Sequence, residues 1–261
     1  MTNVEVLNLT SSAAVTVDLV GSSSVATVKS TGATGTVTLN NIASTSAVIT
    51  VQSTAVNHTI DFANSAVTGT ADSATVNVSG MTAGVLTVDA GIETLNLVSG
   101  GSANTIATLT ATGANTLNIS GGQDMTITAA NTVSETINAA TATGDITVTS
   151  NNANATTITT NSGADAVTVT GAGSSVYTVS TGAGNDTVTF AADLLNTDTV
   201  NGGAGTDTLA GVSGDVTSLT RATAATDLID GFETLRITDT LGADLTMANV
   251  QDGLTTLRLD D

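Results

Sequence analysis

The chain has 261 residues, of which 40% are hydrophobic but only 2% aromatic, and it contains neither cysteine nor proline. The lack of cysteine excludes disulfide bonds and thiolate metal sites, and a core of small aliphatic side chains suits a thin solenoid better than a compact globule. The formal net charge of −19, from 23 acidic and four basic residues, argues against nucleic-acid binding and favours divalent cations as partners. No uninterrupted apolar segment is long enough to insert into a membrane.

Short segments in which apolar and polar residues alternate recur about every ten residues. Such alternation is typical of half-buried β-strands, and the segments are separated by turn residues such as Gly, Ser and Asn. Two segments make one coil, so the sequence predicts an all-β, right-handed parallel β-solenoid with roughly 20 residues per coil. The predicted strands include 4–9, 15–19, 35–39, 48–51, 75–78, 85–88, 94–97, 116–119, 125–127, 136–138, 146–148, 167–169, 176–179 and 187–190.

Acidic residues divide the chain into three parts. Residues 1–120 contain few of them and are expected to form a metal-poor solenoid, which residues 121–211 continue with calcium-binding loops. Residues 212–261 break the rhythm with an irregular crossover or short helix at about 219–230 and then resume the strands. The strand motifs at both ends suggest a piece of a longer array, and the N-terminus lacks the features of a signal peptide.

Three acidic loops are spaced by 21 residues, with Asp165, Asp186 and Asp207 in equivalent positions. Residues 202–210 match the calcium-binding nonapeptide pattern G-G-x-G-x-D-x-U-x at every specified position. Glycines can turn backbone carbonyl oxygens inward, the aspartate adds a carboxylate, and Ca²⁺ takes six to eight such oxygen ligands. The predicted Ca²⁺ site residues are Asp165, Gly182, Gly184, Asp186, Asp198, Gly203, Gly205 and Asp207.

Other aspartates lie outside this series of three. Asp198 lies nine residues before Asp207 and is expected on the opposite edge of the solenoid, where Asp193 could join it. Asp124 and Asp145 continue the spacing but lack the paired glycines, so we expect them to be solvated turn residues. The alternative for the whole set is an ordinary series of Asp/Gly turns without metal.

Catalysis is not expected. His58 is the only histidine, which excludes a metal site with several histidine ligands, and we expect it on a strand surface. Outward Thr-x-Thr pairs could form a flat array that orders water, as in ice-binding solenoids, or could simply reflect the β-propensity of threonine. The pairs are Thr126/Thr128, Thr147/Thr149, Thr157/Thr159 and Thr187/Thr189.

Residues 160–210 resemble the β-roll of repeats-in-toxin (RTX) proteins. With its Gly-[Ile/Phe]-Glu-Thr-Leu phrases at 91–95 and 231–235 and its composition rich in Thr, Ala and Val, the whole chain is similar to surface-layer proteins of that superfamily from Gram-negative bacteria. The resemblance implies type I secretion, calcium-dependent folding outside the cell and self-association into a lattice on the cell surface. Anchoring to a cell-surface glycan would fall to a region outside this chain. The calcium loops are fewer than usual, and no C-terminal secretion signal is recognisable.

Three alternatives to a surface-layer subunit remain open at this point. A stalk segment of an RTX-type adhesin would share all the features above. The calcium-binding tail of a secreted protease or lipase would need a catalytic domain upstream. An ice-binding solenoid, a protein of a different class, would need its threonine pairs aligned on one flat face.

Overall fold

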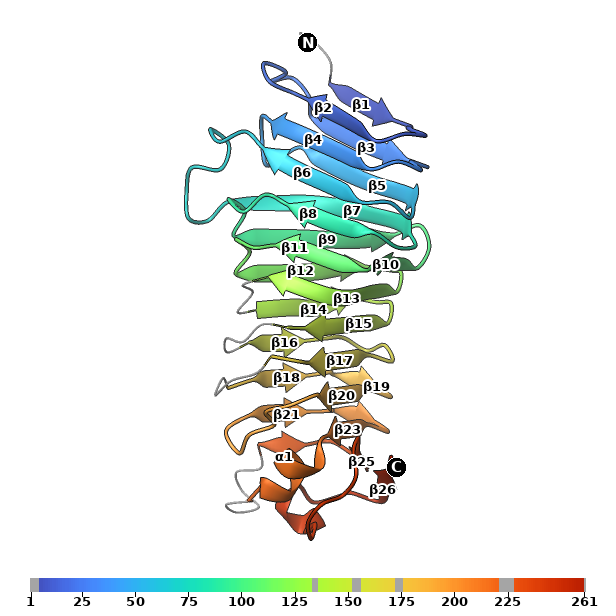
Figure 1. Ribbon diagram of the computed structural model, residues 1–261, viewed down its shortest axis with the longest axis vertical. Coiled ribbons are helices and arrows are strands. Elements are labelled where there is room, and N and C mark those ends of the chain that lie inside the picture. Colours follow the sequence, from blue (N-terminus) through green and yellow to red (C-terminus); the bar gives the residue numbers. More distant parts are fainter. Residues whose placement is uncertain (1–4, 133–135, 152–155, 172–175, 221–227, 261) are drawn as a thin grey trace.

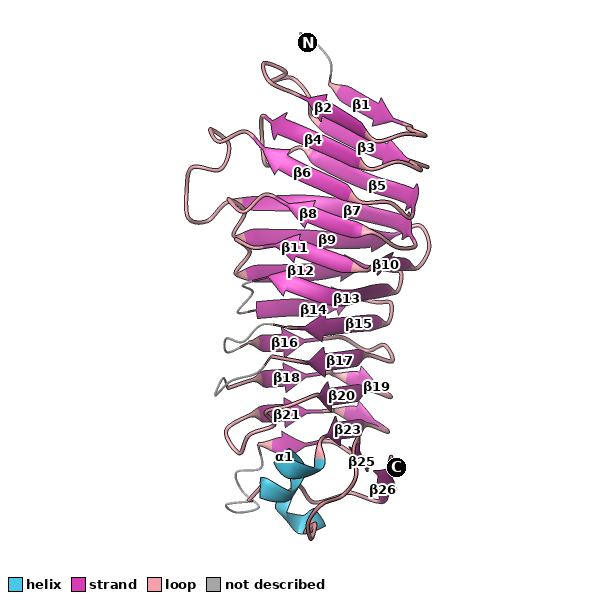
Figure 2. Ribbon diagram, in the orientation of Figure 1, coloured by secondary structure: helices cyan, strands magenta, loops and turns pink. Residues whose placement is uncertain are grey.

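The protein forms the predicted parallel β-solenoid. The computed structural model describes residues 5–132, 136–151, 156–171, 176–220 and 228–260. In these ranges the chain climbs from one end of the molecule to the other as a stack of flat coils, with almost no helix (Figures 1 and 2). Two long parallel sheets face each other across a thin core, and each coil contributes one strand to each sheet.

The first sheet has eleven strands among the described residues. In spatial order they are β1 (Val6–Leu9), β3 (Thr27–Thr31), β5 (Val48–Thr54), β7 (Ser73–Met81), β9 (Thr94–Gly100), β12 (Thr116–Gly121), β14 (Thr136–Ala142), β16 (Thr157–Thr159), β18 (Thr178–Ser180), β21 (Thr199–Asn201) and β24 (Ile229–Asp230).

The second sheet has thirteen strands among the described residues. In spatial order they are β2 (Val15–Asp18), β4 (Val37–Ile42), β6 (His58–Phe62), β8 (Val85–Val88), β11 (Thr108–Ala111), β13 (Met125–Thr132), β15 (Ile146–Ser150), β17 (Ala166–Val169), β20 (Thr187–Phe190), β23 (Thr208–Gly211), β25 (Thr234–Ile237) and β26 (Thr256–Leu259), and β10 (Asn104–Ile106) also pairs with β13.

Successive coils are usually 21 residues apart, slightly more than the predicted 20. Val6 pairs with Thr27 near one end, and Thr187 pairs with Thr208 near the other. Two coils are longer. Residues 63–72 form the loop that projects between β6 and β7 in Figure 1, and helix α1 (Ser213–Ser218) lies between β23 and β24. About 11 turns at about 4.8 Å each give a stack roughly 50 Å long.

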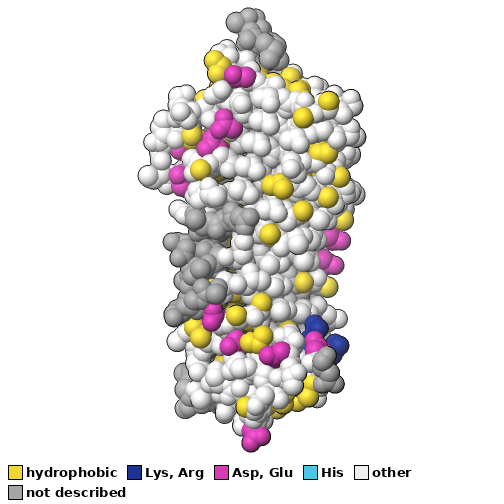
Figure 3. Space-filling view, in the orientation of Figure 1, with side chains coloured by type: hydrophobic (Ala, Val, Ile, Leu, Met, Phe, Trp, Pro, Cys, Tyr) yellow, Lys and Arg dark blue, Asp and Glu magenta, His cyan; other side chains and the backbone are white. Residues whose placement is uncertain are grey.

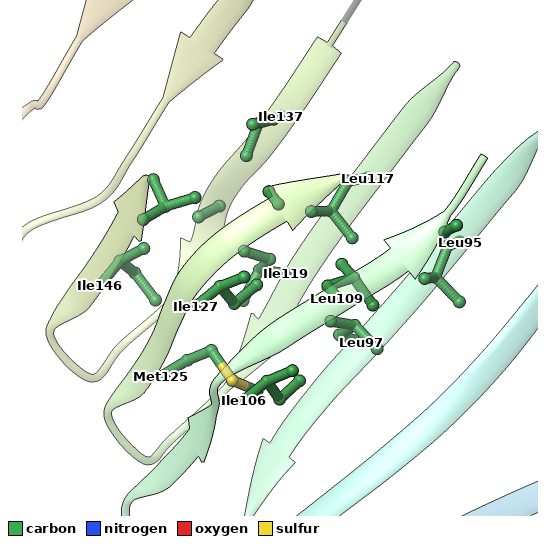
Figure 4. Close-up of a cluster of buried hydrophobic side chains, with 14 of the residues drawn as sticks. Leu95, Leu97, Ile106, Leu109, Leu117, Ile119, Met125, Ile127, Ile137 and Ile146 are labelled. Atoms are coloured by element: carbon green, nitrogen blue, oxygen red, sulfur yellow. The ribbon is translucent and has the colours of Figure 1, made fainter. Parts of the chain in front are cut away.

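The core consists of rows of aliphatic side chains, one residue per coil in each row. Leu95, Leu117 and Ile137 occupy one such row on β9, β12 and β14, and each is at most 1% exposed. Figure 4 shows how side chains from the two sheets meet between them. Because every inward position has a similar neighbour above and below it, small branched residues fill the space without large aromatic ones.

His58 does not lie on the surface, and that expectation is wrong. Its side chain is 1% exposed and alternates with the inward-facing Ile60 and Phe62 along β6. The ring nitrogens are satisfied inside the core, Nδ1 by the carbonyl of Val56 and Nε2 by the Ser30 hydroxyl, both at 3.0 Å. Burial lowers the pKa of His58, an effect that the Val56 carbonyl partly opposes.

The crossover begins with α1, earlier in the chain than the predicted range of 219–230, part of which (221–227) lies outside the described residues. Strands β24, β25 and β26 then rejoin the two sheets, and a short 3₁₀ turn, η1 (Met247–Asn249), precedes β26. The strands therefore resume as expected. In Figure 3 most of the visible face is uncharged, and acidic side chains lie mainly near its margins and its lower part.

Candidate metal centre

Asp165, Asp186 and Asp207 stack in a single column, named here the acidic column. Each aspartate directly precedes a strand of the second sheet, at the edge where the chain passes over from the first sheet. The strands are in register, with Ala166 opposite Thr187 and Thr187 opposite Thr208, so the aspartates before them are also stacked. Their exposed fractions are 2%, 1% and 0%. Three carboxylates are therefore buried one above another.

One oxygen of each carboxylate binds the backbone of the preceding coil. The amide of Asp165 donates to Oδ1 of Asp186 at 2.8 Å, and the amide of Asp186 donates to Oδ1 of Asp207 at 2.7 Å. The amide of Asp207 donates in turn to Oε2 of Glu233 at 2.7 Å. Hydrogen bonds to charged acceptors are stronger than neutral ones, so the column ties four successive coils together.

The second oxygens distinguish the three aspartates. Oδ2 of Asp186 and Oδ2 of Asp207 are buried and have no hydrogen-bond partner. In Asp165, by contrast, Oδ1 accepts the amide of Ile146 at 2.7 Å and Oδ2 accepts the amide of Asn161 at 3.1 Å. An unpaired buried acceptor costs about 1–3 kcal/mol, and more when it is charged. Only Asp186 and Asp207 therefore still need a partner.

The electrostatics of the column disfavour the charged forms of Asp186 and Asp207. Burial raises the pKa of Asp186, and the neighbouring charges of Asp165 and Asp207 add to this. Burial likewise raises the pKa of Asp207, with a contribution from Glu233. The nearby Thr181 hydroxyl opposes the rise at Asp186, although its own bond goes to the carbonyl of Gly202 at 2.8 Å. A cation between the carboxylates would remove this repulsion.

The glycine loops that precede Asp186 and Asp207 are packed directly on one another. Strand β19 (Ala183–Gly184) pairs with β22 (Ala204–Gly205), and Gly182, Gly184, Gly203 and Gly205 all have positive φ angles. A Cβ added at Gly203 would collide with the carbonyl of Gly182, and one at Gly205 with the carbonyl of Gly184. Only glycine allows this approach of one backbone to the next.

The donor set fits a hard cation if backbone oxygens take part. No group of three or more His, Cys, Asp or Glu side chains that could hold a metal occurs within the described ranges. Two carboxylates with free oxygens and the carbonyls of stacked glycine loops are oxygen donors of the type that Ca²⁺ prefers. The residues that would hold the ion are Asp186 and Asp207, with Gly182, Gly184, Gly203 and Gly205 shaping the loops around them.

Asp198 lies apart from the acidic column. It precedes β21 of the first sheet, which places it on the opposite edge as expected, and it is fully buried. Its Oδ1 accepts the amide of Tyr177 at 2.9 Å and its Oδ2 accepts the amide of Leu195 at 2.8 Å. Burial raises its pKa, and the charge of Asp193 adds to the shift. Both oxygens thus serve the backbone, which is a structural role.

Asp124 and Asp145 also lie outside the column, although their spacing of 21 and 20 residues is close to that of the column. Met125 pairs with Ile146, and the amide of Ile146 binds Asp165, so Ile146 rather than Asp145 stands next to Asp165. The register between these two coils is 19 residues, since Thr147 pairs with Ala166, whereas Asp145 and Asp165 are 20 residues apart, so Asp145 is displaced from the column by one residue. Both side chains are exposed, which agrees with the expectation of solvated turn residues.

Two residues of this edge escaped the sequence analysis. Glu233 ends the column by accepting the amide of Asp207, and its place in the phrase Gly231-Phe232-Glu233 directly before a strand was the available signal. Asn161, which stands where the next two loops have Gly182 and Gly203, closes over Asp165. The loss of glycine at that position was visible in the sequence, but its effect on the carboxylate was not.

Comparison of the chain with protein-family models, with curated proteins and with solved structures returned no match. Within the described residues, no helix has the length and apolar character needed to cross a membrane.

Proposed function

We propose that this chain is a structural segment of a secreted bacterial surface-layer protein and that Ca²⁺ stabilises it at the acidic column. The observation that carries the calcium proposal is the pair of buried carboxylate oxygens without hydrogen-bond partners, on Asp186 and Asp207. When bound, Ca²⁺ would supply positive charge where burial and neighbouring carboxylates make ionisation unfavourable.

The role is mechanical rather than catalytic. A rigid rod with a net charge of −19 would be held together by calcium outside the cell, where the ion is abundant, and its partners would be other copies of itself in a lattice. The match of residues 202–210 to the RTX calcium-binding nonapeptide pattern is what suggests secretion and a location at the cell surface. Binding to nucleic acid or insertion into a membrane has no support in the charge pattern.

The calcium proposal is tested by thermal unfolding followed by circular dichroism, in calcium and in a calcium chelator. Calcium at about 100 times its Kd adds about 2.7 kcal/mol to the free energy of unfolding. The Asp186→Asn/Asp207→Asn double variant should lose this response, whereas the matched Asp124→Asn/Asp145→Asn variant should retain it. A wild-type melting temperature that is the same in calcium and in chelator would contradict the proposal.

The lattice proposal needs its own measurement. Electron microscopy of the protein in calcium should show ordered two-dimensional arrays that dissolve in chelator. Isolated rods under all conditions would instead favour the stalk segment of an adhesin, which has the same fold.

One observation favours a second candidate, an ice-binding surface. Thr94, Thr116, Thr136, Thr157, Thr178 and Thr199 lie in register on consecutive strands of the first sheet, about 4.8 Å apart. The Thr-x-Thr pairs themselves are divided between the faces: Thr157/Thr159 is on the first sheet and the other three are on the second. Thermal hysteresis that disappears on replacing Thr136 and Thr157 with lysine would support this candidate.

A further inference from the structure

We propose that, of the three aspartates in the acidic column, only Asp186 and Asp207 bind the cation, and that Asn161 prevents Asp165 from binding one. This inference rests on the calcium binding proposed above and goes beyond it, because the sequence pattern places all three aspartates in one equivalent series.

The three carboxylates of the acidic column have the same setting but differ in the bonding of their second oxygen. Asp165, Asp186 and Asp207 are all at most 2% exposed, and each accepts an amide from the preceding coil through Oδ1. At Asp165 alone, a backbone N–H also reaches Oδ2. Oδ2 of Asp165 is therefore not free to bind a cation, because it already accepts a hydrogen bond from this N–H.

The backbone conformation at residue 161 is the cause of the extra hydrogen bond to Asp165. Loops 160–165 and 181–186 begin alike: the hydroxyls of Thr160 and Thr181 each donate to a carbonyl 21 residues further on. The next residue differs. Gly182 has a φ of 95°, whereas Asn161 is not among the residues with positive φ and points its amide at Asp165.

The Asn161 side chain stabilises this backbone conformation through two hydrogen bonds. Its Nδ2 donates to the carbonyl of Gly144 at 2.9 Å, and its Oδ1 accepts the amide of Gly163 at 2.5 Å. The loop before Asp165 is thus filled by its own polar groups. A glycine at position 161 would remove both bonds and could adopt the left-handed conformation of Gly182, which would release Oδ2 of Asp165.

The test measures calcium affinity and stoichiometry by isothermal titration calorimetry and by metal analysis of the dialysed protein. Asp165→Asn should leave both unchanged, whereas Asp186→Asn and Asp207→Asn should each weaken binding by about tenfold or more. Asn161→Gly should bind one more Ca²⁺ per chain than the wild type. Asn161→Ala is the matched control: it loses the same side-chain bonds but disfavours positive φ, so its stoichiometry should stay at the wild-type value.

The outcomes separate this inference from the proposed function. If the wild type binds no calcium, the proposed function fails. If the wild type binds calcium but Asp165→Asn weakens it as much as Asp186→Asn does, the closure at Asp165 is refuted while calcium binding stands. If Asn161→Ala gains an ion together with Asn161→Gly, the side chain rather than the backbone conformation sets the limit, and the argument from φ is overturned. An Asn161→Gly variant that keeps wild-type circular dichroism but gains no ion also refutes the closure.

Discussion

The buried histidine gives a prediction that does not depend on calcium: acidification below about pH 6.5 should destabilise the protein through His58. The side chain is 1% exposed, and its neighbours in the adjacent coils are Val37 and Leu86, neither of which can compensate a charge. Burial lowers its pKa in the folded state, whereas in the unfolded chain the pKa is near the ordinary value of about 6.5.

The sign follows from proton binding. Between the unfolded pKa and the lower folded pKa, the unfolded chain binds a proton that the folded protein does not bind. The free energy of unfolding therefore falls with decreasing pH by up to about 1.4 kcal/mol per pH unit in that window. Above pH 6.5 the histidine is neutral in both states, and its contribution is fully present.

Urea unfolding at several pH values between about 7.5 and 5, in chelator, measures this effect. His58→Gln should be less stable than the wild type at pH 7.5, because it alters a packed core position, but it should lose less stability on acidification. Most carboxylates titrate below this range, so the difference between the two proteins isolates the histidine. Parallel decreases in wild type and variant would refute the reasoning.

Three further outcomes are expected. Leu117→Ala removes a fully buried side chain from a core row and should cost about 2–5 kcal/mol in urea unfolding, whereas Thr116→Ala on the outer face of the same strand should change the stability by about 0.5 kcal/mol or less. Gly205→Ala forces a Cβ onto a residue with a φ of 155° and against the carbonyl of Gly184 in the preceding loop, so it should lower the stability by about 1–3 kcal/mol, seen as a lower melting temperature even in chelator. Asp198→Asn should cost about 1–3 kcal/mol, because its Nδ2 would face a backbone N–H, while the calcium affinity measured by calorimetry remains that of the wild type.

The fold could be predicted because the solenoid repeats one simple pattern. Alternation with period two gave the strands, and the 21-residue spacing of Asp165, Asp186 and Asp207 gave the coil and the stacked column. The prediction failed for His58. Its alternation with Ile60 and Phe62 indicates an inward position, but the polar character of histidine suggested the surface.

The site could be predicted only in part, because a spacing does not reveal which atoms are already bonded. The 20-residue spacing of Asp145 and Asp165 was visible in the sequence, but the 19-residue coil between them, which leaves Asp145 outside the column, was not. No pattern revealed that Asp198 has both oxygens bound to backbone amides, or that the amide of Asn161 reaches Asp165. These bonds depend on local backbone angles, which residue types limit but do not fix.

The coil-to-coil amide bonds of the acidic column have a consequence for how such a rod can change in length. Oδ1 of Asp186 and Oδ1 of Asp207 each accept a backbone amide 21 residues earlier, and every residue except proline provides such an amide. Removing or duplicating one complete 21-residue coil here therefore presents the remaining aspartate with an equivalent donor, whereas an aspartate spacing that differs from the coil length by one residue displaces the aspartate from the column, as between Asp145 and Asp165. The length of the rod can therefore change in steps of one whole coil, and gene duplication can add such a coil while preserving these amide bonds.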